Sequence, residues 1–168
     1  EKLKVVTFQA KLGTYFEKVE RVRVLARWLA EKFAAQNLTG ANADAADRAA
    51  MLAKCDLVTG MVGEFSELQG IMGGLYAKAQ GEREDVSEAV YDHYLPGGFG
   101  DSLPRNLTGA TVALADKLDT LAGCFSVGLA PTGSSDPFAL RRAALGVMLI
   151  ILDRQLRLSM KEVAAKTV

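Results

Sequence analysis

The strongest constraint on the fold lies in residues 131–152, which read PTGSSDPFALRRAALGVMLIIL. Asp136 precedes Pro137, and an acidic N-cap followed by proline at the first helical position is a favoured helix start. Residues 143–152 are apolar almost all the way round a helix, which is typical of a buried helix. The sequence therefore predicts a helix that begins at Pro137 and is buried rather than only docked on one face.

Two arginines, Arg141 and Arg142, fall in the early turns of this predicted helix. Cations there oppose the helix dipole, which favours negative charge at the N-terminus. The pair therefore requires an anionic partner, either carboxylates of this chain or a phosphate from outside. Asp116 and Asp119 lie three residues apart on a predicted helix and share one face, so they are the favoured partners. Together with Asp136, they are the candidates for structural ion pairs.

A phosphate contact is the alternative interpretation of the arginine pair. Free backbone N–H groups at a helix start help to bind anions, and the preceding loop adds hydroxyl and amide donors. The sequence contains no GxxxxGK[ST] phosphate-binding loop. The candidate phosphate-binding residues are therefore Arg141, Arg142, Thr132, Ser134 and Ser135.

The hydrophobic pattern is helical almost throughout, with no convincing strand alternation. Thr14 and Glu17 have the spacing of a capping box, and so do Ser159 and Glu162. The pattern predicts an all-α bundle of about seven helices. The expected helices are residues 14–35, 43–58, 60–79 with a break near 63–66, 86–95, 107–125, one from 137, and one from 159.

Length and charge restrict the class of protein. The chain has 168 residues, with 20 basic and 20 acidic side chains. We expect a single domain over residues 1–168, and no bulk charge draws it onto DNA or an acidic membrane. Cys55 and Cys124 lack metal-binding spacing and are interpreted as buried free thiols of a cytoplasmic protein.

Five segments resemble the β subunit of the bacterial-type tetrameric glycyl-tRNA synthetase. The first is PTGSSDPFALRRAALGV, which starts at Pro131. The others are KLGTYFEKVERVRVLA, DLVTGMVGEFSELQGIMG, HYLP and VALADKLDTLAG, in residues 11–26, 56–73, 93–96 and 112–123. They span most of the chain and follow the order of the family. Because that β subunit is several times longer, the resemblance implies that this chain is an internal portion of it.

The resemblance also implies an activity. The intact enzyme joins glycine to its tRNA, using ATP and magnesium and passing through glycyl-adenylate. The α subunit carries the aminoacylation site, the β subunit serves tRNA recognition, and the assembly is α2β2. We expect no cofactor and no catalytic residue in this portion, and no membrane or DNA partner.

The order of motifs resembles the HD superfamily, helical phosphohydrolases that hold a metal through an H…HD…D set. Asp116 stands in the segment that resembles the last aspartate of that set, but Ala53 and Lys54 stand at the HD dipeptide. The one histidine, His93, lies outside the motif, and a metal site needs several converging ligands. We therefore expect a degenerate, HD-like bundle without a metal, and disfavour a metal-dependent phosphohydrolase.

Two functional hypotheses remain. The first is a module of glycine–tRNA ligase that supports tRNA recognition or subunit architecture and is not itself catalytic. The alternative is a purely structural interdomain module that does not contact tRNA.

The first predicted helix carries basic residues that alternate with acidic ones, and we interpret them as a solvated helix face: Lys18, Arg21, Arg23 and Arg27. Trp28 is expected in the core or at an interface.

Overall fold

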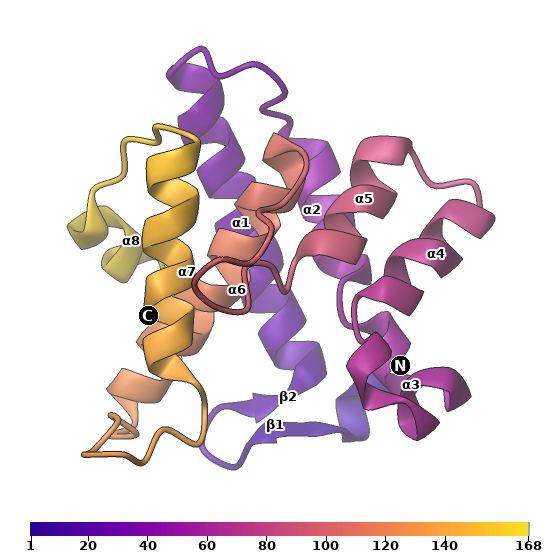
Figure 1. The fold of residues 1–168 in the computed structure, drawn as a ribbon, viewed down its shortest axis with the longest axis vertical. Helices are drawn as coiled ribbons and strands as arrows, with labels where there is room; N and C mark the ends of the chain where they lie inside the picture. The colour runs from indigo at the N-terminus through magenta and orange to yellow at the C-terminus, as the bar shows by residue number, and fades with distance from the viewer. Residues whose placement is uncertain (168) are drawn as a thin grey trace.

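The computed structural model describes residues 1–167. Over these residues the chain forms eight α-helices, three 3₁₀ helices and one small sheet, which confirms the all-α prediction (Figure 1). The α-helices are α1 (Tyr15–Ala35), α2 (Ala43–Leu52), α3 (Gly60–Glu64), α4 (Ile71–Ala79), α5 (Glu84–Asp92), α6 (Leu107–Ser126), α7 (Leu140–Asp153) and α8 (Met160–Thr167). The short elements are η1 (Lys2–Val5), η2 (Cys55–Val58), η3 (Ser66–Leu68), β1 (Thr7–Gln9) and β2 (Gly13–Thr14).

Helix α1 begins at its predicted capping box. The Thr14 hydroxyl accepts the Glu17 N–H at 3.3 Å, and the Glu17 carboxylate accepts the Thr14 N–H at 2.7 Å. Just before it, β1 and β2 form an antiparallel pair with Thr7 opposite Thr14. The sequence did not indicate these strands because segments of three and two residues are too short to show an alternating pattern.

Helix α6 forms the centre of the bundle. Its residues are buried from Leu107 through Asp119, so it is covered on every side over its first three turns. Small side chains at Gly109, Ala110 and Ala113 let neighbouring helices approach closely. Helices α1, α2, α5, α7 and α8 pack against it, with α4 on the far side of α5 (Figure 1).

Helix α7 begins at Leu140, three residues later than predicted, so the expected start at Pro137 is wrong. Ala139 adopts a left-handed conformation with φ of 53°, which separates Pro137 from the helix. Asp136 still caps the helix, because its carboxylate accepts the N–H groups of Leu140 at 2.8 Å and Arg141 at 3.0 Å. The cap therefore acts across an intervening turn rather than from the adjacent position.

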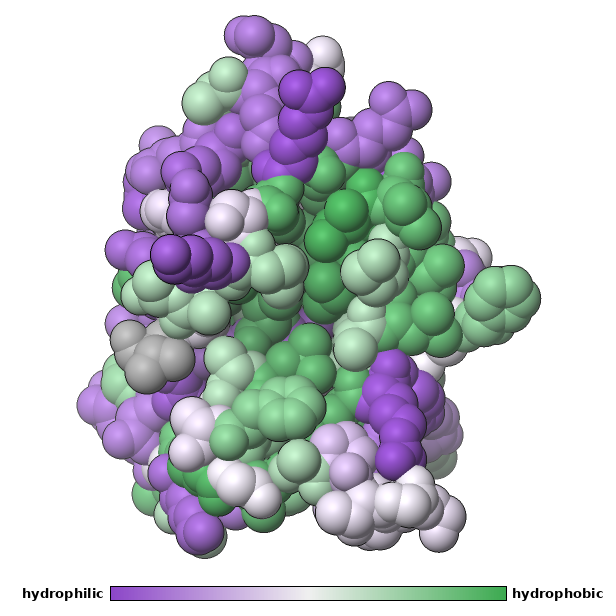
Figure 2. Space-filling view, turned by 90° about the vertical axis from the view of Figure 1, so that its left-hand side faces the viewer, coloured by the Kyte–Doolittle hydropathy of each residue, from purple (hydrophilic) through white to green (hydrophobic). Residues whose placement is uncertain are grey.

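The expected burial of α7 is also wrong. One face, with Gly146, Val147 and Ile150, is buried against the bundle. On the other face Met148 is 54% exposed and Leu152 is 68% exposed. Figure 2 shows this side of the molecule, where hydrophobic residues gather into one continuous area. Nothing within residues 1–167 covers this outer face of α7.

Residues 43–79 contain more breaks than predicted. The helix expected over residues 43–58 ends at Leu52 and is followed by η2, whereas the predicted break in 60–79 is confirmed by α3, η3 and α4. Cys124 is buried as expected, but Cys55 is exposed, because it lies in η2 at the surface. Among the described helices, none is both long and apolar enough to cross a membrane.

Candidate functional site

A cluster of buried charges occupies the space between α1, α6 and the turn after α2. Asp116 on α6 accepts from Lys54 Nζ at 2.9 Å through Oδ2, and Lys18 Nζ on α1 lies 3.0 Å from Oδ1. All three side chains are nearly or fully excluded from solvent. Each carboxylate oxygen of Asp116 therefore faces an ammonium group.

Asp119 extends this cluster by one helical turn. Its carboxylate accepts from Lys18 Nζ at 3.0 Å and from Arg21 Nε at 2.7 Å. Lys18 and Arg21 are three residues apart on α1, and Asp116 and Asp119 are three apart on α6. Two helices packed side by side thus present matching pairs of opposite charge. We call Lys18, Arg21, Lys54, Asp116 and Asp119 the ion-pair cluster.

The ion-pair cluster corrects two expectations. Lys18 is buried rather than part of a solvated face, since its side chain is 3% exposed. Asp116 and Asp119 pair with these α1 and α2-turn cations and not with Arg141 or Arg142 as expected. The three-residue spacing of Lys18 and Arg21 matched that of the two aspartates, and it was the signal in the sequence that could have predicted the pairing.

The charges fix the protonation of Asp116. Burial raises the pKa of a carboxyl group, but Lys18 and Lys54 outweigh that effect and hold the pKa of Asp116 well below its usual range. Asp116 is therefore an ionised acceptor at neutral pH. It holds no proton that it could give to a substrate.

His93 and Tyr94 close the cluster on the α5 side. Lys54 Nζ lies 3.8 Å from the centroid of the Tyr94 ring, a cation–π contact. His93 is fully buried and its Nδ1 lies 2.6 Å from the carbonyl oxygen of Val90. Burial and the nearby Lys54 lower the pKa of His93 to about 3, so the imidazole is neutral. It packs as a neutral core side chain.

The donor set does not fit a metal ion. Lys54, an ammonium group, stands where the HD pattern has an aspartate, and Ala53 beside it offers no ligand atom. Residues 1–167 contain no group of three or more His, Cys, Asp or Glu side chains arranged to hold a metal. Lys18 and Lys54 supply the positive charge next to Asp116 that a metal ion would supply in the HD pattern.

The structure separates the two arginines of α7. Arg141 donates to the carbonyl oxygen of Gly133 at 2.7 Å, which ties the preceding loop to the helix. The hydroxyl-bearing loop residues Thr132, Ser134 and Ser135 are exposed, and Thr132 and Ser135 pair through their backbones. Arg142 makes no ion pair or hydrogen bond within residues 1–167 and lines a cavity beside α6. The predicted phosphate site is therefore not one cluster of five side chains.

Other arginines of α1 are also paired. Arg23 Nε donates to Asp47 at 2.8 Å, and Arg27 donates to Asp44 at 2.8 Å. These contacts join α1 to α2 at the surface, so the two arginines do not form a free basic stripe. Trp28 is half-buried against the core, with Lys32 Nζ 5.3 Å from its ring centroid.

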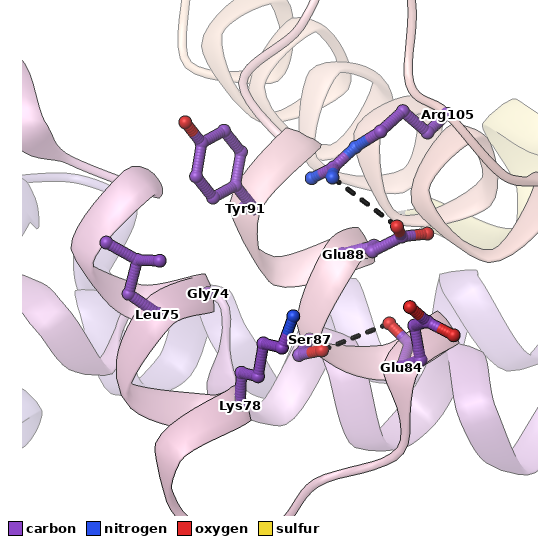
Figure 3. Close-up of a pocket in the computed structure, with 8 residues that line it drawn as sticks. All are labelled: Gly74, Leu75, Lys78, Glu84, Ser87, Glu88, Tyr91 and Arg105. Carbon is purple, nitrogen blue, oxygen red and sulfur yellow. Dashed lines mark hydrogen bonds and ion pairs between the residues drawn. The ribbon is translucent and has the colours of Figure 1, made fainter.

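A second hollow, of about 120 Å³, lies between α4 and α5 (Figure 3). Arg105 contacts Glu88 at 3.4 Å across its rim and is also bonded to the buried Asp92 at 2.9 Å. At its floor Gly74 brings α4 against α5, where an added Cβ would lie 2.5 Å from Tyr91 Cβ. The Arg105 contacts therefore tie α5 to the loop that follows it, and the close approach at Gly74 packs α4 against α5.

Buried Asp56 has a similar structural role. Its carboxylate accepts the N–H groups of Gly70 at 2.7 Å and Gly73 at 3.1 Å. It thereby caps the start of α4, where Gly70 has a positive φ of 79°. A side chain inside one of the five family-like segments is thus explained by helix capping.

Fold and site together define an all-α helical bundle with a buried cluster of lysine–aspartate and arginine–aspartate ion pairs. The chain matches, over residues 1–168, the family described as Glycyl-tRNA synthetase beta subunit. It is 56% identical to the glycine–tRNA ligase beta subunit of Pseudomonas aeruginosa over 160 residues, which is 95% of this chain. The corresponding proteins of Pseudomonas syringae pv. tomato and Pseudomonas putida are 53% and 54% identical, over 96% and 95% of this chain.

The chain belongs to the glycyl-tRNA synthetase β-subunit family. It spans 22% of the length of the Pseudomonas aeruginosa and Pseudomonas putida relatives and 23% of the Pseudomonas syringae relative. The resemblance seen in five segments of the sequence is therefore confirmed at the level of the family.

Proposed function

We propose that this chain is a non-catalytic module of glycine–tRNA ligase. The enzyme would join glycine to its tRNA with ATP and magnesium, and the β subunit would act with an α subunit in an α2β2 assembly in the cytoplasm. The family relationship supports the ligase assignment. The ion-pair cluster supports the non-catalytic role, because Asp116, which stands at the place of the last aspartate of the HD set, is held between two ammonium groups.

A metal-dependent phosphohydrolase does not agree with this geometry. Such an enzyme needs several converging ligands with an open position for water. The ion-pair cluster instead brings cations toward Asp116, and a bound metal would meet repulsion from Lys18 and Lys54. We propose from the motif order that the bundle is HD-like. The cluster geometry supports an HD-like bundle without hydrolase activity.

The geometry favours an architectural role within the ligase. Leu145, Met148 and Leu152 form an exposed apolar strip along α7. Large exposed apolar areas in soluble proteins usually mark contacts with another surface. The matched relatives are more than four times longer than the aligned segment, so β subunits of that length have further chain to cover the strip. We propose that another part of the β subunit packs there.

Contact with glycine tRNA is the second candidate role. Arg142 has no internal partner within the described residues, in contrast with Arg21, Arg23 and Arg27. Because the net charge is zero, RNA contact has to come from such local cations. Its signature would be salt-sensitive binding, since neutralised phosphates release counterions.

The architectural role is tested in the ligase reconstituted from its α subunit and a full-length β subunit. The Leu145→Glu/Met148→Glu variant places two charges on the strip, and Leu75→Glu on the opposite side of the molecule is the control. Leu75 is 48% exposed, similar to the two target residues. We expect the α7 variant alone to lose assembly or glycine charging, while both variants stay folded. Charging at the wild-type rate by the α7 variant would overturn the architectural role.

A further inference from the structure

A cavity of about 300 Å³ lies beside the ion-pair cluster. It is bounded by α6, by the segment after α5 and by the start of α7, and α6 and α7 pack directly against each other. Two cations, Lys117 and Arg142, line it together with the aromatic rings of Tyr94 and Phe138. The architectural role proposed above does not use this cavity, and the tRNA role uses only Arg142 of its lining residues.

Lys117 is a buried cation that has no carboxylate partner among the described residues. The residue is 8% exposed, and its ammonium donates to the carbonyl oxygens of Tyr94 and Leu95, each at 3.1 Å. An ammonium has three N–H donors, so one donor remains without a protein acceptor. Burial and the neighbouring lysines lower the pKa of Lys117 to about 8. A buried ammonium group with one unpaired N–H donor is stabilised by an anion.

Arg142 supplies the second cation at the open side of the cavity. It is exposed, and nothing within residues 1–167 accepts from its guanidinium. Asp116 also reaches the cavity wall and its charge favours the protonated form of Lys117, but its two oxygens face Lys18 and Lys54 and make no ion pair with Lys117 or Arg142 among the described residues. The cavity therefore carries net positive charge in a chain whose total charge is zero.

The walls supply an apolar contact next to these charges. One face of Tyr94 is occupied by Lys54, whereas Phe138 is half-buried at the turn before α7. An aromatic side chain beside a pair of cations suits a ligand with a planar ring and an anionic group. The volume is at the lower end for ligand sites, so it accommodates part of a nucleotide rather than a whole dinucleotide.

We propose that this cavity binds the phosphate group of a nucleotide through Lys117 and Arg142, with the attached nucleoside against Phe138. Arginine supplies paired donors that match phosphate oxygens, and the lysine supplies a point charge. The nucleotide is either free in solution or part of an RNA strand. This inference goes beyond the proposed function, which stands whether or not the cavity holds a ligand.

Binding to the 168-residue chain tests the inference with three probes: inorganic phosphate, adenosine 5′-monophosphate and glycine tRNA. Arg142→Ala removes the exposed cation without touching the core, and Arg141→Ala is the matched control on the same helix. We expect the Arg142 variant to bind roughly tenfold or more weakly, because a charge-assisted hydrogen bond is lost. The control should bind like the wild type.

The probes distinguish the two sources of the phosphate. Binding of the mononucleotide that weakens in Arg142→Ala assigns the cavity to a free nucleotide. Binding of tRNA alone, with a salt slope that falls by about one in the same variant, assigns it to RNA. No binding of any probe at millimolar concentration, or equal losses in Arg141→Ala and Arg142→Ala, overturns the inference. The architectural role is tested separately in the reconstituted ligase, and none of these binding results decides it.

Discussion

Lys54 and Asp116 are 62 residues apart in the chain, and their side chains meet at 2.9 Å in the interior of the bundle. Lys54 is 4% exposed, and Lys18 approaches the same carboxylate from the opposite side. A buried ion pair of this kind fixes the register of the helices that carry it, whatever its net effect on stability. It also replaces the charge that a metal would otherwise bring to Asp116.

Removal of the Asp116 carboxylate should strongly destabilise the chain. Asp116→Ala leaves Lys54 buried without an anion, and we expect a loss of about 3–5 kcal/mol in the free energy of unfolding. Glu162→Ala breaks the exposed pair with Lys32 and should cost less than about 1 kcal/mol. Urea denaturation measures both values. Equal losses in the two variants would contradict a structural role for the ion-pair cluster.

A double variant separates the ion pair from the packing around it. Lys54→Met/Asp116→Leu removes both charges, so no uncompensated ion remains at this contact. We expect it to be more stable than Asp116→Leu alone, with a coupling energy of about 1–3 kcal/mol in the cycle completed by Lys54→Met. Additive losses in the same denaturation experiment would show that the two side chains do not act as a pair.

Acid should lower the free energy of unfolding through His93, at pH values above those at which most carboxylates are protonated. The pKa of His93 is about 3 in the folded chain and has its ordinary value of 6.5 in the unfolded chain, so the unfolded chain binds the extra proton between these values. Stability is therefore fully present above pH 6.5 and falls as the pH decreases towards 3, by about 3 kcal/mol at pH 4.5. The unfolding midpoint of wild type and His93→Asn, followed from pH 7 to 4.5, measures this effect.

The asparagine keeps a side-chain donor for the Val90 carbonyl and does not titrate. We expect its unfolding midpoint to depend much less on pH than that of the wild type. A wild-type protein whose stability is constant from pH 7 to 4.5 would show that His93 is not held neutral by the fold.

Close approach of α4 and α5 should make Gly74 intolerant of a side chain. An added Cβ would lie 2.8 Å from the Ser87 carbonyl oxygen, and backbone there cannot move aside cheaply. We expect Gly74→Ala to cost about 1–3 kcal/mol. Gly63→Ala meets no atom within 4 Å and should be neutral or stabilising, since alanine is the better helix residue. Thermal unfolding of the two variants compares them directly, and equal midpoints would contradict the close contact.

The helical class was predictable because periodicity and capping signals are local. The Thr14–Glu17 capping box gave the start of α1, and the spacing of apolar residues gave α6 to within one residue. The start of α7 was predicted incorrectly because the Asp136-Pro137 signal does not show the left-handed turn at Ala139. Its exposure was not predictable, because an apolar sequence does not specify which partner covers it.

The candidate site was only partly predictable, since charge partners depend on packing. Asp116 and Asp119 were recognised as a pair on one face, but their partners came from α1 and the turn after α2 rather than from α7. Lys18 looked solvated because acidic neighbours surround it in the sequence. Lys117 was overlooked because only the fold shows that it is buried without a carboxylate.

Glycine charging by the ligase with Asp116→Asn in its β subunit tests the central claim most directly. The amide keeps an oxygen that accepts a hydrogen bond, and unfolding is measured first so that charging is assayed where the variant is folded. Under single turnover with saturating tRNA, a structural Asp116 predicts a rate constant equal to that of the wild type. A fall of about 10²-fold or more in a folded variant is the loss typical of a catalytic acid or base, and it would contradict the non-catalytic role.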